Sequence, residues 1–200
     1  MRTSVVLAAT LVVAAAGSSA SAGVVFAVDG ISNNGVISTQ QGEGQLSVDV
    51  SAGIGGTVIF TVINAGPAPS SIANVYFDDM GLLNTATITN GPGVDFTTGG
   101  SPGSLPSGNA VGFITDFRFS ARNPAPIKGV NPVEWVAFTF TTNGGADVNT
   151  IVNAMNSGGL RIGMHVIAFE NGNSESFVTP TPGTAAMLGM AGIAFARRRR

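Results

Sequence analysis

The chain has 200 residues, no cysteine and a net charge of −2, so its fold relies on burial or bound ions and not on disulfides. Residues 23–178 hold four basic and eleven acidic side chains, a net charge of about −7, because the other five arginines lie near the two ends of the chain. This acidic body excludes nucleic acid and anionic membrane surfaces as partners, since both would repel it.

The N-terminus has the pattern of a secretory signal peptide. Arg2 precedes the apolar stretch 5–17, and the small residues Ala20 and Ala22 then offer a cleavage site. We therefore expect signal peptidase to release a mature chain that begins at Gly23. An N-terminal membrane anchor is the alternative, but the stretch is short and no positive charge follows it.

The middle of the chain is patterned as β-structure. Short segments rich in Val, Ile, Phe and Thr are separated by Gly, Pro, Asn and Ser, and in one of them Phe113, Phe117 and Phe119 alternate with Asp116 and Arg118. This alternation favours antiparallel sheets with one wet face. We predict a mainly β fold, an antiparallel β-sandwich of jelly-roll or immunoglobulin-like topology. The segments are residues 24–29, 46–50, 57–64, 72–78, 85–89, 113–120, 134–141 and 161–169.

Carboxylates near glycine-rich turns are the candidate metal ligands. Asp78 and Asp79 end a predicted strand, and Asp95 lies in a stretch rich in glycine. Asp side chains and loop carbonyls are the ligands that Ca²⁺ prefers, so these three residues are candidates for a calcium site. The favoured interpretation is that they are solvated charges that aid solubility. Neighbouring strand residues point to opposite faces, which does not suit the paired carboxylates of a glycosidase.

A long loop is predicted for residues 90–110, which contain six glycines and three prolines. Within it, Gly99 to Gly103 match the pattern G-x-S-x-G, with Ser101 in the place of a hydrolase nucleophile. No helix is predicted to follow Ser101, and Pro102 lacks the N–H that an oxyanion hole needs. A flexible turn is the favoured interpretation.

One short helix is predicted near residues 147–157. Asp147 is a suitable N-cap, Ile151 and Met155 lie on one apolar face, and Gly158 ends the helix.

Three further side chains are weighed as site residues. His165 is the only histidine, and without cysteine a zinc site is hard to assemble, so we interpret it as a hydrogen-bonded sheet residue. Trp135 and Tyr76 are the only amphipathic rings on which a sugar could stack. We expect Trp135 to fill the core.

The C-terminal segment has three parts. Pro180 and Pro182 prevent a helix, residues 185–196 are small or apolar, and four arginines follow. As a helix the apolar part would reach about 18 Å, against about 30 Å for the hydrocarbon of a bilayer. A buried C-terminal helix is the alternative, but this segment has no polar face. The arginines are Arg197, Arg198, Arg199 and Arg200.

A signal peptide combined with such a tail resembles the PEP-CTERM proteins, which are exosortase substrates of Gram-negative bacteria, and in particular the planctomycete-type variants of their sorting signal. In that family the motif is Pro-Glu-Pro, whereas here Thr181 separates Pro180 from Pro182. The resemblance implies export, temporary retention of the tail in the inner membrane, and cleavage near the motif by an exosortase-type enzyme. Residues 149–178 also resemble the end of an ectodomain that recurs with such tails and has no assigned activity.

We therefore expect three regions: a signal peptide (1–22), an exported β-sandwich domain (23–178) and a sorting signal (179–200). The expected function is that of a non-catalytic component of the cell surface or extracellular matrix, without a cofactor and in contact with extracellular polysaccharide. A carbohydrate-binding sandwich module is the alternative, and a hydrolase is the third choice.

Overall fold

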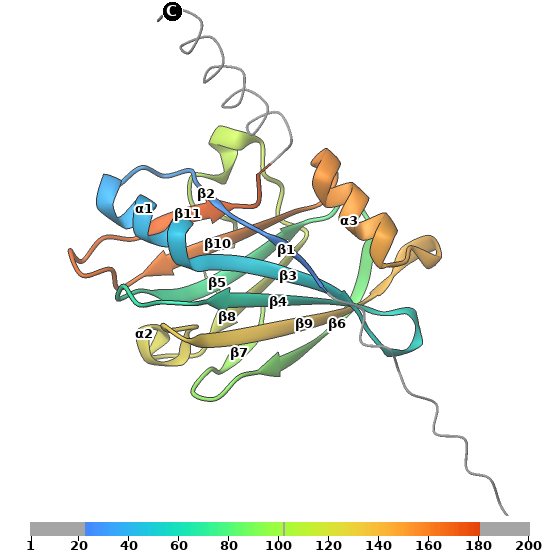
Figure 1. The fold of residues 1–200 in the computed structure, drawn as a ribbon, viewed down its shortest axis with the longest axis horizontal. Coiled ribbons are helices and arrows are strands. Elements are labelled where there is room, and N and C mark those ends of the chain that lie inside the picture. The colour runs from blue at the N-terminus through green and yellow to red at the C-terminus, as the bar shows by residue number, and fades with distance from the viewer. Residues whose placement is uncertain (1–22, 102, 181–200) are drawn as a thin grey trace, which may run out of the picture.

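The computed structural model describes residues 23–101 and 103–180, and it confirms the predicted mainly β fold: two antiparallel sheets pack as a β-sandwich (Figure 1). The predicted signal peptide and the tail from Thr181 onward lie outside the described residues. The five-stranded sheet has the order β1 (Val24–Phe26), β3 (Leu46–Ala52), β4 (Val58–Asn64), β9 (Glu134–Thr142) and β6 (Leu83–Asn90). The six-stranded sheet has the order β2 (Asp29–Gly30), β11 (Glu175–Val178), β10 (Arg161–Ile167), β5 (Ser71–Asp78), β8 (Phe117–Ala121) and β7 (Phe96–Thr98).

The core between the sheets is built from alternating residues and is dominated by phenylalanine. In β4, Val58, Phe60 and Val62 are fully buried, whereas the residues between them face outward. Phe77 of β5 meets Phe60 and Phe140 of the opposite sheet edge to face, with ring centroids 5.3 and 4.9 Å apart. Each such pair contributes about 0.5–1.5 kcal/mol beyond its buried area. Aromatic packing therefore joins the two sheets.

The predicted helix is confirmed as α3 (Val148–Ser157). Asp147 accepts a hydrogen bond from the N–H of Thr150 at 2.8 Å, and Gly158 ends the helix with a positive φ of 78°. Ile151 and Met155 point into the core.

The expectation of a single helix is wrong, because the described residues contain two more, α1 (Val36–Gln45) and α2 (Ala125–Lys128). Helix α1 has two glycines and little amphipathic pattern, so its sequence gave no helical signal. Gly42 is required there, since a Cβ would lie 2.0 Å from the ring of Phe177. The buried carboxylate of Glu175 holds the start of α1 by accepting from the N–H groups of Asn34 and Gly35, at 3.1 and 2.6 Å.

Two predictions for the middle of the chain are corrected. The predicted loop 90–110 contains β7 and a 3₁₀ turn (Gly108–Val111), and the predicted strand 113–120 starts only at Phe117. Phe117 and Phe119 face the core as expected, but Phe113 packs on the outer side of the six-stranded sheet. The short strands β2, β7 and β11 have two to four residues, too few for an alternating pattern to show.

Two further 3₁₀ turns, Ile54–Gly56 and Asn143–Gly145, complete the elements of the described chain. Among these elements, no helix is both long and apolar enough to cross a membrane.

Candidate functional site

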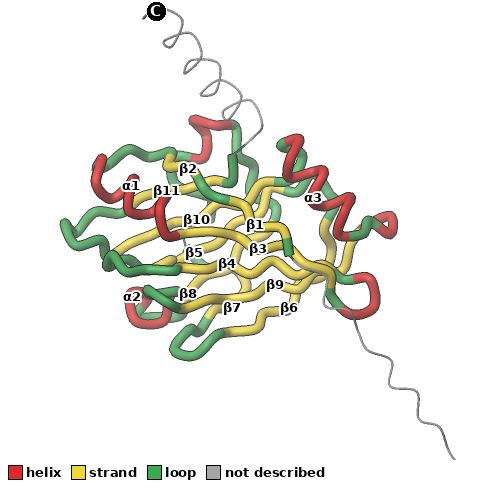
Figure 2. The backbone as a smooth tube through the Cα atoms, in the orientation of Figure 1, coloured by secondary structure: helices red, strands yellow, loops and turns green. Residues whose placement is uncertain are grey.

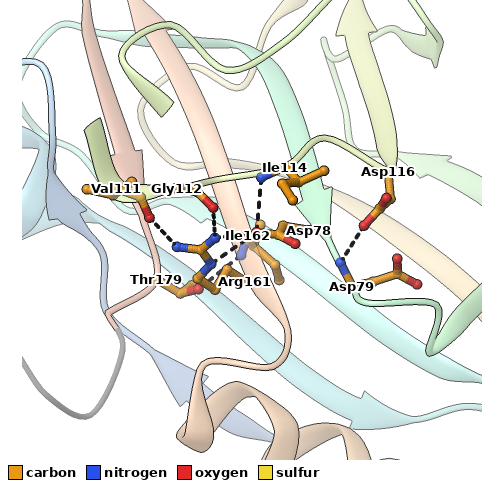
Figure 3. Close-up of polar contacts among 9 residues, drawn as sticks. All are labelled: Asp78, Asp79, Val111, Gly112, Ile114, Asp116, Arg161, Ile162 and Thr179. Atoms are coloured by element: carbon orange, nitrogen blue, oxygen red, sulfur yellow. Dashed lines mark hydrogen bonds and ion pairs between the residues drawn. The ribbon is translucent and has the colours of Figure 1, made fainter. Parts of the chain in front are cut away.

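Asp78, one of the candidate calcium ligands, is part of an ion pair at the end of β5 (Figure 3). The Arg161 guanidinium binds its Oδ2 through two nitrogens, with Nε at 3.1 Å, and the N–H of Ile114 donates to the same oxygen at 3.1 Å. Arg161 also donates to the carbonyls of Val111 and Gly112 at 2.8 and 2.6 Å. The carboxylate of Asp78 therefore fixes an arginine that holds the segment before β8.

Asp79 is buried in a turn and meets a second carboxylate. Its side chain accepts the N–H groups of Gly81 and Leu83 at 3.2 and 2.5 Å, and its own N–H donates to Asp116 at 2.9 Å. Burial raises the pKa of Asp79 above its ordinary value, and the nearby Asp116 raises it further, although the two N–H groups oppose the shift. The interpretation of Asp78 and Asp79 as solvated charges is wrong, since both are buried.

Asp95 lies apart from the other two candidates. Asp95 directly precedes β7, and its Oδ1 lies 3.4 Å from Nε of the exposed Arg122, which follows the end of β8. Asp78 lies instead beside the start of β8. The structure therefore does not bring the three predicted ligands together. No group of three or more acidic or histidine side chains that could hold a metal ion occurs among residues 23–101 and 103–180.

His165 and Ser101 do not form a nucleophile–base pair with each other in this fold. His165 is a sheet residue, as interpreted from the sequence, and its Nδ1 lies 3.3 Å from Oδ1 of Asn74; burial lowers its pKa. The carbonyl of Ser101 accepts a hydrogen bond from the side chain of Asn74 at 3.3 Å. β7 ends at Thr98 and the next helical turn begins at Gly108, so the strand–turn–helix context of a nucleophile elbow is not met.

The two candidate stacking rings have opposite surroundings. Tyr76 is fully buried beneath Leu105 and Phe113 on the outer side of the six-stranded sheet, and burial raises its pKa to about 12. Trp135, which we expected in the core, is 36% exposed. The pattern of β9 explains the error, because Val136 and Phe138 face the core and the residue before them must face outward. The alternation in the sequence contained this signal.

Trp135 lies at one end of an open surface that we call the threonine face. It consists of the outward residues of β4, β6 and β9 and carries no charged side chain, although Asp49 lies beside it on β3. Ile63 is paired with Trp135 across the strands, and both line a pocket of about 440 Å³ with the exposed Val133. Glu134 also lines this pocket, and its carboxylate accepts the N–H of Asn131 at 2.8 Å. Figure 2 shows the three helices at the rim of the sandwich. The members of the face are Ile59, Thr61, Ile63, Thr85, Thr87, Thr89, Trp135, Ala137, Thr139 and Thr141.

A buried polar network supports the edge of this pocket. The side-chain amide of Gln45 donates to Asn64, Ala68 and Ser70 at 2.8–2.9 Å. Asn64 in turn accepts the N–H of Val133 through its carbonyl at 2.7 Å. The pocket beside Trp135 is thus held by a rigid part of the fold.

Comparison of the chain with family models, with curated proteins and with solved structures found no match.

Proposed function

We propose that this protein is an exported, non-catalytic component of the cell surface or extracellular matrix. The observation that supports this proposal is the position of the folded domain between the two signals that we predict from the sequence. β1 starts at Val24, directly after the expected cleavage at Ala22, and the last strand-like contacts are those of Thr179, directly before Pro180. A single sandwich therefore occupies the chain between the two expected cleavage sites.

The placement of its reactive groups also favours a non-catalytic role. Asp78, Asp79 and Glu175 are occupied by hydrogen bonds that fix loops and helix starts, and His165 is bonded within the sheet. Each of these bonds has a structural role, which supports the proposal.

The test is the intact mass of the protein isolated from its native host. We expect a mature chain that begins at Gly23 and lacks Arg197 to Arg200. A variant with Pro180 and Pro182 both replaced by alanine should retain the arginines, whereas the control Pro106→Ala should be processed like the wild type. A wild-type species that keeps all four arginines would contradict the exosortase part of the proposal.

The exposure of Trp135 supports a second candidate function, the binding of an uncharged polysaccharide. An indole beside Ile63 and rows of threonine offers an apolar ring, methyl groups and hydroxyls, which suit the C–H and O–H groups of a neutral sugar chain. On a glycan array, Trp135→Ala should weaken binding about tenfold, which corresponds to ~1.4 kcal/mol. The control Ile127→Ala, at an exposed position of α2, should bind normally; equal binding by both variants would exclude the site.

A further inference from the structure

Strand β6 is the exceptional edge of this sandwich. In the described part of the chain, the four edge strands are β1, β2, β6 and β7; three of them have two or three residues, and β6 has eight. Its sequence LNTATITN contains no charge and no proline, which are two of the devices that protect an edge from pairing. Its register shift against β9 lies at its start, between Leu83 and Ala86, so the edge from Ala86 to Asn90 is regular. A long, uncharged edge is a template for another strand.

The hydrogen-bond pattern shows which residues face outward along this edge. Gly91 donates its N–H to the carbonyl of Trp135. In an antiparallel ladder every second residue forms main-chain hydrogen bonds to the same neighbour, so Thr89 and Thr87 also direct their N–H and C=O groups toward β9. The main-chain groups of Ala86 and Ile88 therefore point away from β9 to the free edge.

The amino-acid sequence of β6 is almost the same in both directions. Around Thr87, the sequence from Asn84 to Asn90 is N-T-A-T-I-T-N, and the only mismatch is Ala86 against Ile88. Antiparallel pairing of two copies about Thr87 would place each Thr85 opposite the partner's Thr89, and each Ala86 opposite the partner's Ile88. In this register, the main-chain N–H and C=O groups that point to the free edge of one strand lie opposite the same groups of the other strand. An antiparallel ladder requires this arrangement.

We propose that two copies of this protein associate through β6, antiparallel and two-fold symmetric about Thr87, so that their five-stranded sheets form one continuous sheet. About four main-chain hydrogen bonds form between the Ala86 and Ile88 positions of the two strands. Ile88 is packed against the core but partly exposed, so a partner strand would cover its open side. The uncharged edge lets two acidic bodies meet without placing like charges opposite each other.

The absence of cysteine allows a direct test by disulfide trapping in the full chain, kept in detergent. In the proposed register, the two Thr87 residues form a non-hydrogen-bonded pair with Cα atoms about 4.5 Å apart, within the range of a disulfide. Thr87→Cys should therefore give a covalent dimer under mild oxidation. Thr85→Cys is the matched control, because its two copies would lie about 13 Å apart and cannot be bridged.

The double variant Thr85→Cys/Thr89→Cys should again form a dimer, since each Thr85 faces the partner's Thr89. Thr139→Cys, one strand away on the same face, should stay monomeric. Failure of Thr87→Cys to exceed Thr85→Cys and Thr139→Cys would overturn the proposal, and equal trapping of all three would show random collision.

A charge variant tests the association without a cross-link. Thr87→Lys places one positive charge from each copy at the symmetry axis, on the solvent-facing side of the sheet. The two charges repel, so the protein should sediment as a monomer instead of a dimer in the same detergent. Thr139→Lys should remain dimeric. A wild-type chain that sediments as a monomer at every concentration, or that pairs only with an added peptide of a different protein, would show that the edge does not bind its own copy.

Discussion

Asp79 is a buried residue whose surroundings disfavour its charged form. Its pKa is raised because it is buried and because Asp116 lies beside it. A raised pKa in the folded state means that folding favours the protonated form, so stability is lost as the pH rises above the ordinary value of 3.8 and through the folded pKa. Above its folded pKa, the ionised carboxylate of Asp79 therefore costs stability, through its burial and through its repulsion by Asp116.

We predict that Asp116→Asn stabilises the protein at pH 7. The amide oxygen still accepts the N–H of Asp79, and the repulsion is removed, so the Tm should rise by about 1–2 °C for ~0.5 kcal/mol. At pH 3, below the ordinary value of 3.8, the raised pKa of Asp79 keeps this carboxyl protonated, and the gain should vanish. Calorimetry at the two pH values checks this, with Glu170→Gln as the control; an equal gain at pH 3 would refute the assignment to charge.

Single residues also show where sequence reasoning fails. Asp78 and Asp79 precede Met80 and Gly81, a turn signal that indicated a solvated surface. Asp78 is instead satisfied by Arg161, which lies 83 residues further along the chain, and no local pattern announces such a partner. Trp135 is the opposite case, because the period of two in β9 was sufficient to place it outside the core.

The segment that precedes β8 is held in place by one side chain, Arg161. Arg161 bonds the carbonyls of Val111 and Gly112, and its guanidinium lies 5.3 Å from the ring centroid of Phe113. Phe113 and Leu105 in turn cover Tyr76. These contacts of Arg161 hold residues 103–115 over the outer side of the six-stranded sheet, and we call this segment the lid.

We predict that Arg161→Lys loosens this lid and leaves the sandwich folded. Lysine cannot satisfy Asp78 and two carbonyls in the planar geometry of a guanidinium, so amide exchange in residues 103–115 should become at least about tenfold faster. Hydrogen exchange measured by mass spectrometry reports each segment separately. Arg122→Lys, whose partner Asp95 lies outside this segment, is the control; uniform acceleration in β4 and β9 would mean global destabilisation instead.

The elements found from sequence are those with a long periodic signal. α3 combines a side-chain cap, an apolar stripe and a terminal glycine, and β4 alternates over seven residues. α1 has none of these, because tertiary contacts with Phe177 and Glu175 hold it in place. Asp95 lies apart from Asp78 and Asp79 for a related reason: proximity to turns in the sequence does not place carboxylates together in space.

For the whole molecule, the main finding at the C-terminal boundary is that the folded structure extends to Thr179. This residue is buried, donates its N–H to the carbonyl of Ile162 at 2.9 Å, and accepts the N–H of Ile162 through Oγ1 at 3.0 Å. The expected domain boundary at residue 178 thus omits one structural residue. The class of the fold was predictable from alternation, but the order of strands was not, since it depends on which distant strands pair.

We predict that a chain of residues 23–180 unfolds cooperatively and is more stable than one of residues 23–178. Loss of the two bonds to Ile162 leaves buried main-chain groups without a protein partner and should lower the free energy of unfolding by about 1–3 kcal/mol. Urea titrations followed by circular dichroism measure the difference. Thr179→Val in the longer chain should reproduce part of the loss, and identical midpoints for both lengths would show that Thr179 is dispensable.

The position of β11 has a mechanical consequence. This strand lies between β2 and β10, and it leads directly through Thr179, where the predicted sorting signal begins, to Pro180. Tension applied at Pro180 along the strand would load the ladders on both sides in parallel, so their bonds would have to rupture together instead of one after another. If the domain is held by its C-terminal end, the hydrogen bonds of β11 to β2 and β10 would resist the pulling force directly.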